Sequence, residues 1–523
     1  MPVAGFCKET GMNLSSIDMA VLLVYFAGLT ALGVWCARRT KTSDQFMAAG
    51  RSMPGWALAL TLFGSFVSSI SFLAQPGKSY ADNWNPFVFC IALPFAAIVG
   101  AFIFVPFYRR TGEVSAYSHL EHRFGSWART YATACFILLQ LTRTGVVTFL
   151  LSMALAPAFG MDPTKDTGGL IAIIVAVGIV MTIFPLIGGT DAAIWTGAAQ
   201  SLVLATGMIV SLIMVFVKMP GGAGKVFEVA AQHNKFSLGS GEIDFAKSTI
   251  LVVFLYALSE NLKNFGVDQK YVQLYATAKT DKDARSSVWA GALMYIPLAA
   301  MTFMIGTALF AFYSVQPGLL PEGIKSDKVF PHFIYTQLPA GIKGLVVAAI
   351  CAAATDSSFN CISTLFHCDV YKRYFRPKVS ERESLLVLRV TTIACGVLSV
   401  AISMAMIRVK TILDAWWTLA GIMAGGMLGL FLLGIISRRA GNKAAIAGVT
   451  VGTAAIIWMS LSLESFWGAI RAFAPEAKSP EWFQPYRFPW HDFMIPVVGT
   501  ALIIAVGLLV GLISPRQESV AQK

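Results

Sequence analysis

Charged residues are scarce in this chain. Only 13% of its 523 residues are Asp, Glu, Lys or Arg, about half the share of an average soluble protein, whereas 56% are hydrophobic. A chain of this composition has too little polar surface for a soluble fold of this size. We therefore interpret it as a polytopic membrane protein.

Several signatures of enzymes and nucleotide-driven pumps are also missing. No Gly-x-x-x-x-Gly-Lys-Ser/Thr loop occurs, so the sequence gives no support for ATP-driven transport within the chain. Eight cysteines show no metal-ligand spacing, and most lie in or beside hydrophobic segments, where they serve as small apolar side chains. The six histidines are scattered. We expect no enzymatic activity and no cofactor beyond a coupling ion.

Hydrophobic segments recur along the whole chain, and most reach the length of about 20 residues that a helix needs to cross a bilayer core. We predict an all-α integral membrane protein with thirteen spans, at residues 17–36, 54–75, 84–108, 128–155, 169–187, 192–217, 249–275, 287–314, 342–367, 385–407, 411–436, 443–463 and 492–514.

The net charge of +12 follows the predicted topology and does not mark a nucleic-acid surface. With alternating spans, the basic clusters fall on one side, at residues 38–41, 109–129, 279–285, 372–389 and 438–443. Basic loops face the cytoplasm, so we expect the N-terminus outside and the C-terminus inside. We expect a multi-pass protein of the cell membrane, whose partners are the lipid bilayer and a small solute, with no obligate protein partner evident.

Asp356 is a carboxylate in an otherwise apolar stretch, residues 344–366. An ionised Asp at the centre of a membrane helix costs roughly 2.5–3.5 kcal/mol on insertion scales. Such a residue persists where it is used or satisfied. It indicates a protein that handles ions or polar solutes inside the membrane.

Arg143 lies about midway along the span 128–155, beside Gln140 and Thr142. Its planar guanidinium is a donor fork that suits a carboxylate ligand. Alternatively, Arg143 is a structural residue satisfied by Asp356 or by backbone carbonyls.

Polar residues interrupt the span 249–275, and they surround Gly266: Glu260, Asn261, Lys263, Asn264 and Asp268. This polarity is typical of a discontinuous helix that lines a water-filled cavity. Alternatively, Glu260 and Lys263 form an i,i+3 ion pair near an outer helix end.

The span 54–75 carries a central cluster of small and hydroxyl residues, namely Gly64, Ser65, Ser68, Ser69 and Ser71. Such residues also promote close helix packing. Beside a second interrupted span, however, they predict a pair of broken helices, as in transporters built from inverted repeats. The residues alone thus indicate a secondary transporter for an anion.

Four strings resemble motifs of the sodium/solute symporter family, which includes the sodium/glucose, sodium/proline and sialic-acid transporters. They are DQFMAAGRSMPGW at 44–56, GGTDAAIWTGAAQ at 188–200, DQKYVQ at 268–273 and STLFHCDVYK at 363–372. They occur in the family's order, and the resemblance covers residues 17–514.

The resemblance implies a leucine-transporter-type core of two inverted five-helix repeats. One helix precedes this core and two follow it. The expected divisions are an N-terminal helix and first motif at 1–53, a first repeat at 54–217, an external loop at 218–248, a second repeat at 249–436, and two C-terminal helices with a tail at 437–523. The first and second broken helices would be 54–75 and 249–275.

The resemblance also implies a sodium site built from the carbonyls of Gly64, Val67 and Ile350. Two hydroxyl ligands of the family fall on Ala353 and Ala354 here, and the Asp of a second sodium site falls on Gly197. Asp356 and Ser357 occupy positions where members with the second site place hydroxyl ligands.

Three hypotheses for Asp356 stay open. In the first, its carboxylate replaces the one missing at position 197 and so retains a cation site. In the second, it carries a proton and sodium is not used. In the third, it neutralises Arg143 and coupling is lost. Sodium is the coupling ion that the resemblance favours.

The setting of Arg143, LQLTRTGVV at 139–147, resembles the carboxylate-binding helix of the sialic-acid branch. The same alignment places Phe66, Ser68 and Ser71 at substrate-contact positions, and Phe66 replaces a hydroxyl contact. A smaller or flatter carboxylate than sialic acid would suit this aromatic wall. The expected substrate-binding residues are Arg143, Phe66, Ser68, Ser71, Gln140, Glu260, Asn261 and Asn264.

These features predict a cation-coupled symporter that imports a small organic solute, expected to be a carboxylate, by alternating access. A proton-coupled or ion-independent uniporter or exchanger of the same fold is the alternative. A channel would be expected to show rings of charge, and the sequence gives no sign of them.

Overall fold

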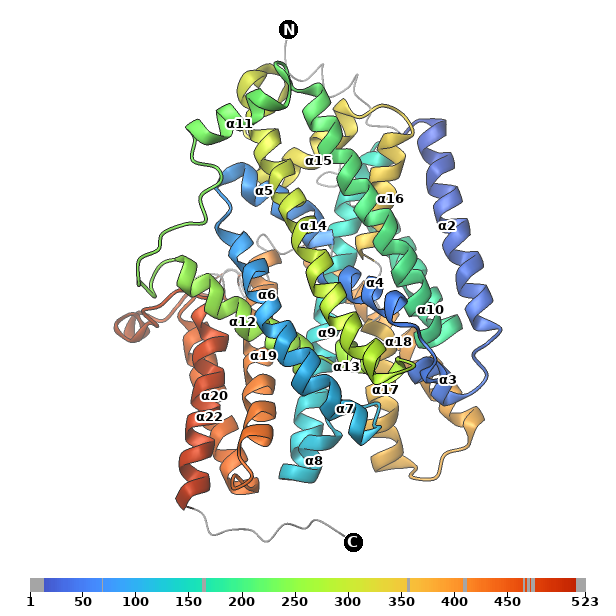
Figure 1. Cartoon of the computed structure of the whole chain (residues 1–523), viewed down its shortest axis with the longest axis vertical. Helices are drawn as coiled ribbons and strands as arrows, with labels where there is room; N and C mark the ends of the chain where they lie inside the picture. Colours follow the sequence, from blue (N-terminus) through green and yellow to red (C-terminus); the bar gives the residue numbers. More distant parts are fainter. Residues whose placement is uncertain are drawn as a thin grey trace.

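The computed structural model describes residues 14–67, 69–161, 166–354, 358–407, 412–463, 466–467, 471 and 476–513. Figure 1 shows a bundle whose long helices run roughly along the long axis of the molecule. No strand occurs among the described residues, where the only bridge joins Met53 to Ala278. The predicted all-α architecture is confirmed.

The helices of the bundle interior and of its ends have the following bounds: α3 (Ser43–Ala48), α4 (Gly55–Phe66), α5 (Ser69–Ala81), α6 (Val88–Val99), α7 (Val105–Thr111), α8 (Ser118–Phe124), α9 (Ser126–Leu155), α10 (Thr167–Lys218), α11 (Gly222–Gln232), α12 (Ile250–Gly266), α13 (Gln269–Thr277), α14 (Asp281–Val315), α15 (Ser326–Gln337), α16 (Ile342–Ala354) and α17 (Ser358–Leu365). A π-helical segment, η6 (Phe366–Phe375), follows α17. The outer helices are α2 (Ser16–Ala37), α18 (Glu381–Met406), α19 (Ile412–Ile436), α20 (Asn442–Leu461) and α22 (Met494–Ile513).

Eight helices in the described ranges are long and apolar enough to cross a membrane, and each of two bent pairs adds one more candidate span. Three shorter apolar helices, Thr167–Ile183, Ile342–Ala352 and Gly425–Ile436, coincide with the remaining predicted segments. In Figure 1, α2 starts at the upper end of the bundle and α22 finishes at the lower end. The count of thirteen and the orientation stay predictions.

Both helices expected to be broken are interrupted, each with a bend of more than 40°. Helix α4 ends at Phe66, and Val67 adopts an extended conformation while its N–H donates to the Gly64 carbonyl at 3.1 Å. Helix α12 ends at Gly266, and Asp268 starts α13 as its N-cap, accepting the Lys270 N–H at 2.9 Å. Because the Asp268 side chain caps the first turn of α13, a new helix can begin inside this apolar segment.

A third interruption lies inside α10, where Gly189 has a φ of +57°. A Cβ at this position would lie 2.7 Å from the Phe46 carbonyl oxygen, so glycine is needed both for the backbone conformation and for the close approach of α3. This break separates the two spans predicted at 169–187 and 192–217.

Asp18 connects the N-terminal helix α2 to the start of α16 through hydrogen bonds. One carboxylate oxygen closes a capping box with Ser15. The other accepts the N–H groups of Gly341 and Gly344 at the start of α16, each at 2.7 Å. The side chain therefore satisfies backbone donors of two helices at once.

Candidate solute-binding and coupling site

The break between α12 and α13 faces the middle of α9 through a buried hydrogen bond. Gln140 Nε2 donates to Asp268 Oδ2 at 3.2 Å, and Ser358 Oγ donates to Gln140 Oε1 at 3.1 Å. Gln140, Asp268 and Ser358 are 1%, 8% and 1% exposed. One amide thus joins α9 both to the start of α13 and to the first residue of α17.

Arg143 lies on the same face of α9 as Gln140, because residues three apart are neighbours on a helix surface. It is half-buried, and it attracts Asp268 electrostatically, as do Lys263 and Lys270. The sequence suggested Asp356 as a counter-ion for Arg143. Asp356 lies outside the described residues, and the sequence presents Asp268 only as one of several polar interruptions.

Phe66, the last residue of α4, lies among three other rings. Its ring centroid is 5.8 Å from that of Phe265, 5.5 Å from Tyr271 and 5.3 Å from Tyr295. Phe265 and Tyr271 belong to the second broken helix, so this aromatic cluster joins the two breaks. Gln75 on α5 donates to the Tyr295 hydroxyl at 3.2 Å, which adds a polar group beside the rings.

The polar residues of α12 have different surroundings. Glu260 Oε2 and Lys263 Nζ are 2.5 Å apart, so the i,i+3 ion pair is confirmed. Asn261 is wholly buried, and neither of its amide atoms has a hydrogen-bond partner among the described residues. Asn264 is half-buried, as is Ser71 on α5. Of this group, Asn261 is the one whose buried polar atoms are left without a protein partner.

The expected ion site is described only in part, because Asp356 and Ser357 lie outside the described residues. The expected substrate contact Ser68 lies outside them as well. Within the described residues, the Gly64 carbonyl accepts a hydrogen bond from the Val67 N–H. A carbonyl oxygen has two lone pairs, so this hydrogen bond does not use up its acceptor capacity. Ile350 is buried in α16, which ends at Ala354.

Gly197, the position at which the resemblance implies an Asp in members with a second sodium site, lies in a tight contact between α4 and α10. A Cβ on Gly197 would lie 3.2 Å from Thr61 Cγ2. Nearby, a Cβ on Gly64 would lie 2.3 Å from Ser201 Oγ, which donates to the carbonyls of Leu60 and Gly197. Packing of small residues therefore occupies the space next to position 197.

The four strings noted in the sequence meet at one end of the bundle. Gln273 Nε2 lies within hydrogen-bond distance of the Met47 carbonyl at 2.6 Å, of Thr190 Oγ1 at 3.0 Å and of Thr364 Oγ1 at 3.1 Å. Each of these three partners belongs to a different string. Gln269 is bonded to the backbone of Val114 and Ala116. Helix α13 is therefore fixed to several neighbours at this end.

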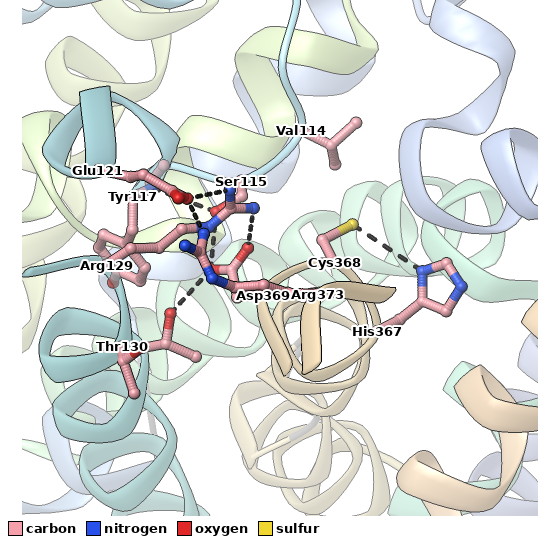
Figure 2. A network of polar contacts seen from close by, with 12 residues as sticks. Val114, Ser115, Tyr117, Glu121, Arg129, Thr130, His367, Cys368, Asp369 and Arg373 are labelled. Carbon is pink, nitrogen blue, oxygen red and sulfur yellow. Dashed lines mark hydrogen bonds and ion pairs between the residues drawn. The ribbon is translucent and has the colours of Figure 1, made fainter. Parts of the chain in front are cut away.

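A buried ionic network lies close by (Figure 2). Asp369 accepts hydrogen bonds from Ser115 Oγ at 2.8 Å and Thr133 Oγ1 at 2.7 Å, and pairs with Arg129. Glu121 pairs with Arg129 at 3.0 Å and also with Arg373. Asp369 is 1% exposed, and we did not predict this buried site from the sequence. The sequence feature that points to it is a carboxylate between the apolar residues Cys368 and Val370, inside the fourth string.

Comparison with known proteins gives a consistent result. The sodium:solute symporter family matches residues 46–452. The chain belongs to this family. It is a transporter of the multi-pass membrane type and not an enzyme, and sodium is the ion that members of the family couple to solute movement.

Two curated relatives and one solved structure illustrate the similarity. The sodium/sialic acid symporter SiaT of Proteus mirabilis is 34% identical over 448 residues, covering 84% of this chain and 89% of that protein. The human sodium-coupled monocarboxylate transporter 2 is 29% identical over 488 residues, covering 90% and 75%. A substrate-bound, outward-open Na⁺-coupled sialic acid symporter superposes with a TM-score of 0.85 at 29% identity, covering 97% and 100%.

Proposed function

We propose that this transporter is a sodium-coupled symporter of a small, flat organic carboxylate. The observation that carries the proposal is the position of Gln140 and Arg143. Their face of α9 lies against the break of the second broken helix, and the aromatic cluster of Phe66 joins that break to the first. A guanidinium beside an aromatic wall suits a carboxylate on an apolar body.

In this proposal Arg143 binds the carboxylate, and Phe66 packs against the body of the solute. Ser68, Ser71, Asn261 and Asn264 supply further polar contacts. The amide of Asn261 has no hydrogen-bond partner within the described part of the chain, which supports this assignment because a buried amide without partners is costly. Glu260 has the lesser role, since Lys263 already binds it.

Sodium would bind to the carbonyls of Gly64, Val67 and Ile350 together with Asp356 and Ser357. Oxygen ligands suit a hard cation, and the Asp356 carboxylate would replace the one missing at position 197 at a site where Ala353 and Ala354 supply no hydroxyl group. The close packing at Gly197 argues for one sodium site in place of two.

The proposed topology has thirteen spans, with the N-terminus outside and the C-terminus inside. The inverted repeats are 54–217 and 249–436, joined by an external loop at 218–248 and flanked by 1–53 and 437–523. The two bent pairs support this division, because each is the first span of its proposed repeat. Alternating access would then move the broken helices against α9, α10 and α17.

The substrate named for SiaT is sialic acid, and that named for the human relative is a monocarboxylate. Both are carboxylates. Phe66 and its three ring contacts leave an aromatic wall, which favours a flat monocarboxylate over a polyhydroxylated sugar acid.

The proposal is tested by uptake into proteoliposomes, with nicotinate, lactate, N-acetylneuraminic acid, glucose and proline as solutes. A sodium gradient should drive accumulation of a carboxylate, with nicotinate preferred, and Arg143→Gln should abolish it. Accumulation driven by protons with sodium absent would favour the proton-coupled alternative. Equilibration without accumulation would favour a uniporter.

A further inference from the structure

We infer that Lys235 is a positioning residue for transport. Its ammonium joins the end of α5 to α14 and to the loop segment 233–239, so that the three move as one body when the site opens and closes. Helix α5 is the second half of the first broken helix, and it carries Ser71. Because Ser71 is a solute contact only in the function proposed above, the effect of Lys235 on solute affinity rests on that proposal.

Lys235 is a buried side chain in an exposed stretch of the chain. It is 5% exposed, whereas residues 231–234 and Phe236 are exposed. The side chain therefore turns inward from the loop. An ammonium has three N–H donors and a full charge, so its burial is costly unless acceptors surround it.

The acceptors are carbonyl oxygens at the end of α5. Lys235 Nζ lies 2.7 Å from the Tyr80 carbonyl oxygen, 3.4 Å from that of Ala81 and 2.9 Å from that of Asp82. The last carbonyls of an α-helix have no partner within the helix, and the partial negative charge at this end attracts a cation. Lys235 therefore caps α5, although 155 positions separate it from Tyr80.

The same ammonium also contacts α14. Its Nζ lies 3.8 Å from the centroid of the Phe310 ring, which is a cation–π contact. Deeper in the bundle, Ser79 Oγ of α5 lies 2.9 Å from Thr307 Oγ1 of α14. A Cβ on Gly306 would lie 2.1 Å from the Pro76 carbonyl oxygen, so the two backbones touch there. Helices α5 and α14 are thus joined along several turns.

The loop segment 233–239 is also bonded to the residues that follow α5. The Trp84 N–H donates to the Ser237 carbonyl at 3.0 Å, and Asn85 Nδ2 donates to the Leu238 carbonyl at 2.9 Å. Separating the loop segment from α5 would break these bonds and leave a buried ammonium without acceptors. We therefore expect the loop segment, α5 and α14 to stay together while other helix contacts change.

The position of α5 affects the aromatic cluster beside the proposed site. Gln75 on α5 donates to the Tyr295 hydroxyl at 3.2 Å, and the Tyr295 ring lies 5.3 Å from that of Phe66. A shift of α5 after loss of its cap would therefore move groups at both breaks. Small displacements of binding groups reduce affinity and rate strongly. Lys235 is expected to act on the solute through this helix without touching it.

The first experiment is amide hydrogen exchange on the solute-free protein in detergent. Lys235→Met removes the ammonium and keeps an unbranched side chain. It should speed exchange about tenfold both at residues 82–87 and in the loop segment 233–239, and Lys235→Arg should restore most of the protection. Faster exchange confined to the loop segment would overturn the inference. Lys247→Met is the control, because Lys247 is exposed and pairs with Asp244 of the same loop.

The second experiment asks whether α5 and α14 move together. The Ser79 and Thr307 oxygens are 2.9 Å apart, so Ser79→Cys with Thr307→Cys places two thiols within reach of a disulfide. After oxidation with diamide, nicotinate uptake into proteoliposomes should stay within about twofold of the reduced protein. Uptake that stops on oxidation and returns with a reductant would overturn the inference. Wild-type protein treated with diamide controls for the native cysteines.

The third experiment measures initial rates of nicotinate uptake. Lys235→Met should raise the KM on the order of tenfold with a smaller change in maximal rate, and Lys235→Arg should recover most of the loss. A lower maximal rate at unchanged KM would show that Lys235 only supports folding, which would overturn the positioning role. If the wild-type protein takes up no nicotinate, the proposed solute is wrong. The exchange measurement needs no solute, so it then still decides whether Lys235 holds α5.

Discussion

Gln140 donates a hydrogen bond to Asp268 across 3.2 Å, between the middle of α9 and the break of the second broken helix. The two residues are 128 positions apart in the sequence. Their contact brings the face of α9 that carries Arg143 to the point where α12 gives way to α13. The proposed site is built around this contact.

Gln140→Leu should destabilise the protein while keeping the volume of the side chain. The substitution leaves Asp268 Oδ2 and the Ser358 hydroxyl without their partner, which costs about 1–3 kcal/mol per buried group. The melting temperature in detergent measures this loss. The nearby half-buried Thr142→Val serves as a control, and an equal effect of both substitutions would contradict a special role for Gln140.

Arg143→Lys should raise the KM for a carboxylate on the order of a hundredfold while the protein still folds. Lysine keeps the positive charge but lacks the planar fork that binds both oxygens of a carboxylate. Initial rates of uptake at varied solute concentration give the KM. An unchanged KM in this variant would show that Arg143 does not contact the solute.

Phe66→Ser should shift selectivity from flat carboxylates towards polyhydroxylated ones. The substitution removes three ring contacts, worth about 0.5–1.5 kcal/mol each, and introduces a hydroxyl where the resemblance implies a hydroxyl contact with the solute. Competition between nicotinate and N-acetylneuraminic acid for uptake measures the preference. If the ratio of their inhibition constants stays the same, Phe66 does not form the wall of the site.

Gly64→Ala should prevent folding, and Ser201→Ala should rescue it. The added methyl group would lie 2.3 Å from Ser201 Oγ but 3.6 Å from Ser201 Cβ, so removing the hydroxyl clears the space. Expression with a monodisperse size-exclusion profile is the measurement. Gly224→Ala is the control, because a Cβ there meets nothing within 4 Å. Failure of the double variant would contradict the proposed close packing of α4 on α10.

Arg129→Gln should be strongly destabilising, by about 3–5 kcal/mol, because it leaves the buried Asp369 with hydroxyl donors alone. Asp369→Asn added to it should recover part of the loss, since no buried charge then remains at this position. Thermal unfolding of the single and double variants measures both effects. Arg110→Gln, at an exposed position, is the control for loss of an arginine.

The broken helices were predictable because their signal is local. Each apolar segment is interrupted by residues that are close together in the sequence. These are Gly64 with the serines around it in the first segment, and the polar residues from Glu260 to Asp268 in the second. The structure confirms both interruptions. The residues that end and restart these helices, Val67 and Asp268, also lie within the predicted segments.

The partners of the polar residues were not predictable, because they come from distant parts of the chain. Asp268 near Arg143, and Gln273 between Met47, Thr190 and Thr364, depend on how the helices pack. The sequence shows that position 197 is a glycine where the resemblance implies an Asp. Only the structure shows that Thr61 occupies the neighbouring space.

The most direct test of sodium-coupled carboxylate symport is the flux of radioactive sodium into proteoliposomes, measured with and without nicotinate outside. The account predicts that nicotinate stimulates sodium entry in the wild-type protein, and that Arg143→Gln and Asp356→Asn each abolish the stimulation. Nicotinate uptake that proceeds at full rate with no accompanying sodium entry would contradict it.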